Sequence, residues 1–222
     1  MIRFKGILLE DNYRHQGLRK RLIAELEYKG ISDRKVLEAI GKIPRHFFLD
    51  SSFVEFAYQD KAFPIGEDQT ISQPYTVAFQ SELLQVQPMQ KVLEVGTGSG
   101  YQAIVLMELG AKVFSIERVK TLHSRTKELL HAMGYNPRLF YGDGYKGLPS
   151  FAPFDRIIVT AAAPSIPDML LQQLKTGGIL VIPVGDSSGI QVMTTVTRQT
   201  DGSFIEKQHG QFRFVPMVEN KK

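Results

Sequence analysis

One stretch constrains the fold of this chain more than any other: Lys91-Val-Leu-Glu94-Val-Gly96-Thr-Gly98-Ser-Gly100-Tyr101. Its first five residues have the apolar pattern of a buried strand and a helical run follows from 102 to 109, so the stretch predicts strand, tight loop and helix. Three alternating glycines allow positive φ and close approach of a ligand, and the free N–H groups of the helix start point into the same space. We expect a cradle for a nucleotide-like cofactor; an ordinary glycine-rich turn is the alternative.

The spacing of the glycines bears on the kind of cofactor. A dinucleotide fingerprint is Gly-x-Gly-x-x-Gly, whereas the third glycine here comes one residue early and Tyr101 takes its place, which disfavours NAD. Tyr101 also stands five positions after Gly96, where an ATPase phosphate loop requires glycine. Glu94 would repel a pyrophosphate just ahead of the loop but would attract a sulfonium or amino group. The combination favours S-adenosylmethionine.

Composition narrows the class of protein. The chain has 222 residues, of which 43% are hydrophobic and 23% charged, enough for one sizeable α/β core. No apolar run approaches the ~20 residues of a membrane span, and the N-terminal apolar run is too short for a signal peptide, so we expect a cytoplasmic protein. The absence of cysteine excludes disulfides, thiolate zinc sites and a cysteine nucleophile. No metal site is expected, because the five histidines lack ligand spacing.

Periodicity predicts an α/β fold with a doubly wound, mostly parallel sheet. Helices are expected over 13–29, after a cap at Ser32 or Asp33, and from Pro74 onward, and the first sixty residues are expected to be helical and peripheral. Strands and helices then alternate at 112–116, 119–133, 137–141, 155–160, 167–174 and 178–183, and an antiparallel pair follows at 190–197 and 204–214. We treat 1–222 as one domain: about 1–88 helical with a substrate loop, about 89–186 a cofactor-binding core, and about 187–218 the antiparallel strands.

Acidic residues end two of the predicted parallel strands, at the edge where ligands bind in such sheets. Glu117 stands 21 positions after Gly96 and is expected to accept hydrogen bonds from ribose hydroxyls, with helix initiation as the alternative. Asp143, between two glycines, is expected to face an adenine, although Asp also favours turns without any ligand.

Two serines call for separate treatment. Ser72 stands in Thr70-Ile71-Ser72-Gln73-Pro74, a turn-rich loop before a helix, where local chemistry alone favours helix capping over a functional role. Ser187 lies in a Gly-x-Ser-x-Gly string, but a strand pattern follows it where a hydrolase nucleophile requires a helix. We interpret that string as a hairpin loop.

Five motifs together resemble the protein-L-isoaspartate O-methyltransferases over about residues 15–218. They are Thr70 to Pro74, Val92 to Tyr101, Gly142-Asp143-Gly144, Thr160-Ala-Ala-Ala-Pro164 and Arg213-Phe-Val-Pro216. The glycine loop is common to Rossmann-like methyltransferases, so the first and last motifs carry the specificity.

The resemblance implies a seven-stranded Rossmann-like methyltransferase sheet and S-adenosylmethionine as donor, with S-adenosylhomocysteine as product. The acceptor would be the free α-carboxylate of L-isoaspartyl residues in damaged proteins, whose ester closes to a succinimide. Carried over to this sequence, it implies Ser72 as the active-site hydroxyl. The cofactor contacts are expected to be Glu94, Gly96, Thr97, Gly98, Gly100, Glu117, Arg118, Asp143 and Gly144, and the substrate contacts Thr70, Ile71, Ser72, Phe214, Val215 and Pro216. Some members have Thr where this chain has Val218, so a side-chain hydrogen bond from that position is not expected.

Alternative functions remain open at this point. Residues 1–50 carry 11 Lys+Arg and 7 Asp+Glu, a basic excess that a nucleic-acid methyltransferase could use, although interspersed signs usually mark a solvated face. Two absences weaken that class. Methylation of cytosine C5 needs a cysteine nucleophile, and enzymes that methylate base amino groups commonly have an Asn-Pro-Pro-Tyr loop where this chain has Ala161-Ala-Ala-Pro164. An NAD(P)-dependent oxidoreductase and a non-catalytic nucleotide-binding module are the remaining alternatives. We expect isoaspartyl proteins as partners, no nucleic acid and a monomer.

Overall fold

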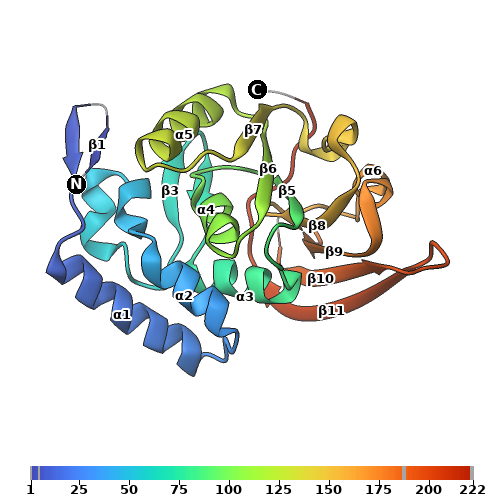
Figure 1. Cartoon of the computed structure of the whole chain (residues 1–222), viewed down its shortest axis with the longest axis horizontal. Helices are drawn as coiled ribbons and strands as arrows, with labels where there is room; N and C mark the ends of the chain where they lie inside the picture. Colours follow the sequence, from blue (N-terminus) through green and yellow to red (C-terminus); the bar gives the residue numbers. More distant parts are fainter. Residues whose placement is uncertain (1, 5, 187–188, 221–222) are drawn as a thin grey trace.

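A single seven-stranded sheet organises the structure, a computed structural model that describes residues 2–4, 6–186 and 189–220 (Figure 1). Its spatial order is β11 (Phe204–Phe212), β10 (Gln191–Arg198), β9 (Leu174–Val184), β8 (Phe154–Val159), β5 (Lys91–Val95), β6 (Lys112–Glu117) and β7 (Arg138–Tyr141). The five strands from β9 to β7 run parallel, whereas β10 is antiparallel to both β9 and β11. The predicted fold class, including the C-terminal antiparallel pair, is confirmed.

The chain reverses direction across the sheet at its centre. Strand β5 pairs with β6 on one side and with β8 on the other, so the connections that follow β5 and β8 leave toward opposite edges. The crevice outside the carboxyl ends of strands at such a switch point is where open α/β sheets bind ligands. The glycine loop begins at this crevice, immediately after β5.

Helices cover the two faces of the sheet unequally. On one face α3 (Pro74–Leu84) and α4 (Tyr101–Glu108) pack on the central strands, and α5 (Lys120–Ala132) packs beside α4 and against β7. The other face is covered by short pieces, α6 (Asp168–Gln172), the 3₁₀ turn η4 (Pro149–Phe151) and the chain around them. No helix among the described residues is long and apolar enough to cross a membrane.

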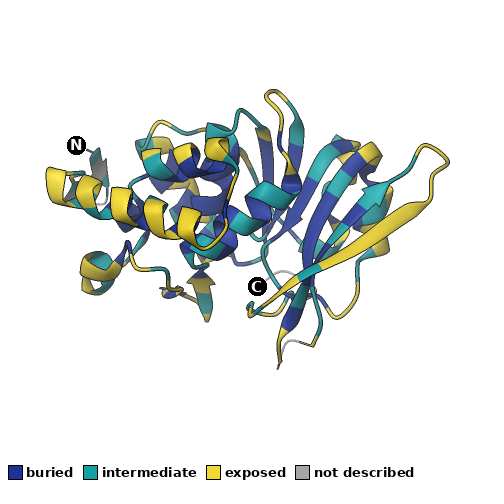
Figure 2. Cartoon of the chain, turned by 90° about the horizontal axis from the view of Figure 1, so that it is seen from below, coloured by how far each residue is buried: buried dark blue, intermediate teal, exposed yellow. Residues whose placement is uncertain are grey.

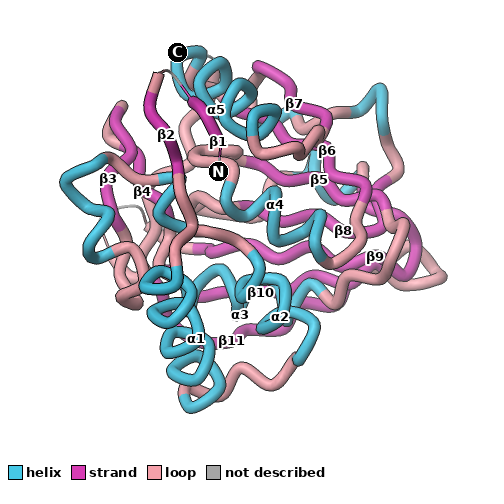
Figure 3. The backbone as a smooth tube through the Cα atoms, turned by 60° about the vertical axis from the view of Figure 1, so that its left-hand side comes forward, coloured by secondary structure: helices cyan, strands magenta, loops and turns pink. Residues whose placement is uncertain are grey.

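The N-terminal region adds a further layer over α3 and α4. It consists of α1 (Tyr13–Tyr28), α2 (Arg34–Lys42) and the 3₁₀ turns η1 (Arg45–Phe48) and η2 (Ser51–Phe56), and Asp33 caps α2 by accepting from Lys35 N at 2.8 Å. Figure 2 shows the outward face of α1 exposed, and Figure 3 shows α1 in front of the sheet. The inward side chains Leu26, Ile40 and Phe48 are buried in one cluster with side chains of α3, α4 and α5. The helices were predicted, but this buried core makes the layer less peripheral than expected.

Two small antiparallel ladders were not predicted. One joins β1 (Ile2–Phe4) to β2 (Ile7–Leu9), and the other joins β3 (Phe63–Gly66) to β4 (Gln69–Ile71) where a loop was expected. Glu67 and Asp68 turn the second hairpin with φ of 55° and 57°, a conformation that hairpin turns usually form with Gly, Asn or Asp rather than Glu. Sequence reasoning therefore missed a hairpin whose second strand contains Thr70 and leads directly to Ser72.

The connection between β9 and β10 is the predicted hairpin. The two strands pair antiparallel from Val184 opposite Val192 to Ile179 opposite Thr197. Ser187, the serine of the Gly-x-Ser-x-Gly string, lies outside the described residues.

Candidate active site

The glycine loop has the backbone conformation that its sequence predicts. Gly96, Gly98 and Gly100 have φ of 97°, 51° and 84°, and the loop closes with Gly100 N donating to Thr97 O at 2.8 Å before α4 begins. A Cβ at position 96 would lie 2.5 Å from Thr160 Oγ1, closer than real Cβ contacts. Glycine at 96 is therefore required both by its φ and by the close approach of the chain after β8.

Three side chains from neighbouring elements hold this loop in place. Thr160 donates to Gly96 O at 2.6 Å, Thr126 of α5 donates to Gly98 O at 2.6 Å, and Gly98 N donates to a carboxylate oxygen of Glu117 at 2.8 Å. Hydrogen bonds to the carbonyls of Gly96 and Gly98 and from the N–H of Gly98 therefore fix the loop without a ligand. Neither threonine was assigned a contact from the sequence, although Thr160 begins one of the five motifs, because these contacts join elements that are distant in the chain.

Glu117 lies at the carboxyl end of β6, as predicted. Its two carboxylate oxygens accept from Gly98 N and Val119 N, both at 2.8 Å, and the residue is 5% exposed. A carboxylate offers about four acceptor positions, so each oxygen keeps one for a further donor such as a ribose hydroxyl. The backbone bonds fix the orientation of the carboxylate, and its contact with ribose stays a prediction.

Glu94 lies under the loop rather than beside it. It faces α3 and α4 from β5, is 0% exposed and accepts a hydrogen bond from the Ser115 hydroxyl. Burial raises its pKa to about 8, against which the Ser115 hydrogen bond works in part. At neutral pH the group is protonated, so the attraction for a cationic ligand that the sequence suggested loses its basis. A direct cofactor contact from Glu94 stays a prediction.

Ser72 follows β4 and precedes α3 without capping that helix. Gln73 is the N-cap and makes no side-chain cap hydrogen bond, while Pro74 fills the first turn. The carboxylate of Asp60 instead accepts from Tyr75 N at 2.7 Å. The capping alternative is wrong for Ser72, and its hydroxyl has no hydrogen-bond partner within residues 2–4, 6–186 and 189–220.

The C-terminal segment lies beside Ser72 because the chain after β8 binds it. Ala162 N donates to Val215 O at 2.8 Å, and Met217 N donates to Ala162 O at 2.7 Å. Gln191 accepts from Phe214 N at 2.8 Å. The small side chains after β8 therefore let a second backbone pack closely at the edge of the glycine loop.

Three adjoining cavities share walls at the carboxyl ends of β5 and β8. The strand-end cavity is lined by Gln69, Thr70, Val95, Gly96, Gly98, Ile116, Glu117, Arg118, Gly144, Thr160, Ala161 and residues 215–218. The serine–tyrosine cavity is lined by Thr70, Ile71, Ser72, Val77, Gly96, Thr97, Gly98, Ser99, Tyr101, Gln102 and Thr160. The serine–arginine cavity is lined by Ala62, Thr70, Ser72, Gln73, Thr76, Thr160, Arg213, Phe214 and Val215. Thr70 and Thr160 line all three.

Most of the predicted site residues therefore gather in one place. All six expected substrate contacts line at least one cavity, as do six of the nine expected cofactor contacts, Gly96, Thr97, Gly98, Glu117, Arg118 and Gly144. The exceptions lie just outside the walls: Glu94 is covered, Gly100 gives room to Thr126, and Asp143 accepts from Tyr145 N at 3.0 Å in a turn. Their roles stay predictions.

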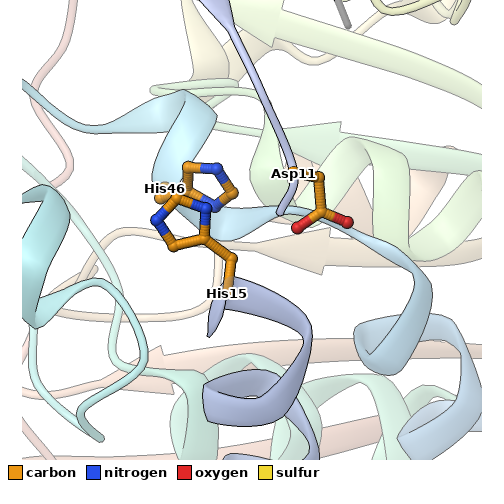
Figure 4. Close-up of side chains that lie close together, drawn as sticks. All are labelled: Asp11, His15 and His46. Carbon is orange, nitrogen blue, oxygen red and sulfur yellow. The ribbon is translucent and has the colours of Figure 1, made fainter. Parts of the chain in front are cut away.

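A group of three possible metal ligands lies elsewhere, at the start of α1 (Figure 4). The donor atoms of Asp11, His15 and His46 lie within 4.8 Å of one another. However, Arg19 donates to both Asp11 oxygens at 3.0 and 2.8 Å, and the His46 nitrogens are 2.8 Å from Tyr58 Oη and 3.0 Å from Glu10 O. These hydrogen bonds occupy the ligand atoms of two of the three residues and place a guanidinium beside them. The arrangement favours a structural role.

Comparison with known proteins agrees with this geometry. The family model described as protein-L-isoaspartate(D-aspartate) O-methyltransferase matches residues 17–222. A protein-L-isoaspartate O-methyltransferase of Christiangramia forsetii is 60% identical, over 96% of this chain and 100% of its own length.

Two solved structures extend the comparison. One, a protein-L-isoaspartate O-methyltransferase, superposes with a TM-score of 0.82 at 30% identity, over 91% of this chain and 66% of the other. A second, from Plasmodium falciparum and in complex with S-adenosyl-L-homocysteine, has a TM-score of 0.80 at 25% identity, over 95% and 100% of the two chains. This chain belongs to the protein-L-isoaspartate(D-aspartate) O-methyltransferase family.

Proposed function

We propose that this chain transfers a methyl group from S-adenosylmethionine to the free α-carboxylate of L-isoaspartyl residues, the first step in returning such residues to aspartate through a succinimide. One observation carries the proposal: Thr70 and Thr160 are common walls of the strand-end cavity, next to the glycine loop, and of both cavities that contain Ser72. A donor on the glycine loop and an acceptor on Ser72 would meet at these two threonines.

The strand-end cavity fits the donor. Gly96 and Gly144 line this cavity with backbone, and an added Cβ would lie 2.5 Å from Thr160 Oγ1 or 2.6 Å from Val95 Cγ1, so a side chain at either position would displace a neighbour. Glu117 keeps acceptor capacity for ribose hydroxyls, and Arg118 and the segment 215–218 also line this cavity. The Plasmodium falciparum relative carries the demethylated form of this cofactor. When bound, S-adenosylmethionine supplies an electrophilic methyl group on a cationic sulfur.

The acceptor side needs to position its substrate rather than to activate it. A carboxylate with an ordinary pKa of about 4 is already ionised at neutral pH, so no general base is required. Ser72 would donate its hydroxyl hydrogen to one carboxylate oxygen and leave the other directed at the methyl group. Holding two reactants in line can lower a barrier by several kcal/mol. Phe214, Val215 and Pro216 would then contact the peptide around the isoaspartyl residue.

Other parts of the assignment stay predictions. The division into regions 1–88, 89–186 and 187–218, the monomeric state, the absence of nucleic-acid binding and the cytoplasmic location rest on the sequence alone. The role of each site residue is likewise a proposal that the cavity walls support.

The experiment that tests the function compares matched peptides. With methyl-labelled S-adenosylmethionine, an isoaspartyl peptide should be methylated far faster than its aspartyl isomer, because only the isomerised linkage presents a free α-carboxylate. Equal rates would indicate a general carboxyl methyltransferase. If the labelled methyl group enters RNA or DNA but no peptide, the protein is a nucleic-acid methyltransferase. If calorimetry shows binding of NADH but not of S-adenosylmethionine, the oxidoreductase alternative holds.

A further inference from the structure

Arg45 is an arginine with no exposure to solvent and no carboxylate in hydrogen-bond contact among the described residues. It begins η1, is 0% exposed, and donates through Nη2 to Ser72 O at 2.9 Å and to Lys61 O at 3.2 Å. Its guanidinium carbon lies 5.0 Å from the ring centroid of Tyr101, whereas Nε and Nη1 have no hydrogen-bond partner in the described part of the chain.

Burial of this charged side chain is energetically unfavourable for folding. Arginine is almost never fully buried without a paired anion, and a buried ion pair often adds no stability over apolar residues of the same size. Burial lowers the Arg45 pKa to about 10, which still leaves the side chain charged at neutral pH. Tyr101 and the carboxylate of Asp60 act against this lowering, but Arg45 forms no direct ion pair among the described residues, so its burial is poorly explained by a contribution to folding alone.

The contacts of Arg45 connect the parts of the candidate active site. Ser72 carries the hydroxyl assigned to the acceptor, Lys61 precedes Ala62 in the wall of the serine–arginine cavity, and Tyr101 is the first residue after the glycine loop. The ring of Tyr101 is also packed edge-on by Phe48, one turn along η1, at 5.3 Å between centroids. Thus η1 touches both the acceptor segment and the end of the cofactor loop.

We propose that Arg45 is a positioning residue that sets the Ser72 hydroxyl relative to the glycine loop, through its hydrogen bond to the Ser72 carbonyl and its stacking on Tyr101. This inference rests on the proposed function. The planar guanidinium can bond two carbonyls and stack on a ring at the same time, which an ammonium group cannot. Residue 72 has few other constraints, because it lies outside both β4 and α3 and caps neither.

The test is a double-mutant cycle. Arg45→Met keeps the side-chain bulk but removes the charge and donors, and should lower kcat for the isoaspartyl peptide about 10- to 100-fold, the scale expected when a catalytic group is displaced. S-adenosylhomocysteine affinity should change less than about 3-fold, since Phe48 still supports Tyr101. Arg45→Lys should recover part of the rate. Because Arg45 is inferred to act through Ser72, adding Arg45→Met to Ser72→Ala should slow the enzyme by less than about 3-fold more.

Arg156 provides a matched control. It is half-buried, and its guanidinium also donates to carbonyls, Leu84 O at 2.7 Å, Asp155 O at 2.8 Å and Gln85 O at 3.4 Å, but it lines none of the three cavities. Arg156→Met should cost stability and leave kcat unchanged. Normal kcat in folded Arg45→Met, additive effects in the double mutant, or an equal kcat loss in Arg156→Met would each overturn the inference. If Arg45→Met does not fold, Arg45→Lys takes its place in the double-mutant cycle with Ser72→Ala. A wild-type protein that methylates no isoaspartyl peptide would instead overturn the proposed function.

Discussion

The two sides of the candidate active site are built in different ways. Most of the cofactor side is made of consecutive strand–loop–helix units between residues 91 and 144, with Gly96 and Gly98 at positive φ, and residues 69–70, 160–161 and 215–218 complete its lining. The acceptor side joins Ser72 to Arg213, which stands 141 positions later in the sequence. The cofactor side is therefore mainly a local property of the chain, whereas the acceptor side exists only after distant segments have met.

What holds each side differs accordingly. The glycine loop is fixed by hydrogen bonds from the hydroxyls of Thr126 and Thr160 and by one that Gly98 N donates to Glu117, the last residue of β6. The acceptor segments are held by backbone and side-chain bonds across the sheet edge, such as Ala162 N to Val215 O and Arg45 to Ser72 O. Because different residues hold the two sides, we expect that mutations can affect cofactor binding and methyl transfer separately.

The largest effect is expected on the cofactor side. Gly96→Ala should weaken S-adenosylmethionine binding by more than about 100-fold. An alanine with a φ of 97° has a strained backbone, and its Cβ would lie 2.5 Å from Thr160 Oγ1. Isothermal calorimetry on the folded variant measures the loss. Gly134→Ala is the control, since φ is 83° there and no atom lies within 4 Å of the added Cβ. Similar affinities for the two variants would show that the loop is not a close-fitting cradle.

Next in size is Ser72→Ala, which probes the acceptor side alone. Single-turnover methyl transfer should slow about 100-fold while S-adenosylmethionine affinity changes less than about 2-fold, because the hydroxyl is expected to orient the carboxylate. The unfolding free energy should be nearly unchanged, since Ser72 caps no helix.

A true helix cap supplies the control for that variant. Asp33 accepts from Lys35 N and Val36 N at the start of α2, so Asp33→Ala should lose about 0.5 to 2 kcal/mol of stability and keep its turnover. If folded Ser72→Ala transferred methyl groups at the normal rate, the catalytic assignment would be wrong and the comparison of the two sides would lose its acceptor half.

Glu117→Gln should have a smaller effect on the cofactor side. The amide has only one acceptor oxygen for two backbone donors, Gly98 N and Val119 N, so both the loop and the ribose contact suffer, and S-adenosylmethionine affinity should fall by about 1.5 to 3 kcal/mol. Glu82 is a matched carboxylate, which accepts from Ser32 N and Asp33 N away from the cavities. Glu82→Gln should lower stability only, and unchanged affinity in Glu117→Gln would remove the ribose assignment.

The same contrast explains what sequence could predict. The order β5, glycine loop, α4 and β6 follows from spacing within ten or so residues, as does a cap at Ser32 or Asp33, of which the structure uses Asp33. The β3–β4 hairpin could not, because its turn residues Glu67 and Asp68 take positive φ without glycine. Ser72 as an active-site residue came from resemblance to a family, since its local context favoured a cap. No local pattern could identify Arg45, whose partners are 16, 27 and 56 positions away.

The smallest effect on activity is expected at Glu94, where the prediction concerns pH. Its pKa is raised from 4.5 to about 8, first by burial and then by the charge of Glu117, so the folded protein keeps a proton that the unfolded chain releases above about pH 4.5. Stability from this group is fully present below pH 4.5 and is lost as the pH rises to about 8, with a slope approaching 1.4 kcal/mol per pH unit. Glu94→Gln stays neutral, so chemical denaturation at pH 5 to 8 should show an unfolding free energy that depends less on pH than in the wild type, with S-adenosylmethionine affinity within about 3-fold.

Asp155→Asn is the control. Hydrogen bonds from Lys91 N and Lys175 help to lower the pKa of Asp155, so its contribution to stability is lost only in acid. Identical slopes in Glu94→Gln and the wild type would mean that Glu94 is ionised in the folded protein. A loss of affinity beyond 10-fold would return it to the cofactor contacts predicted from sequence.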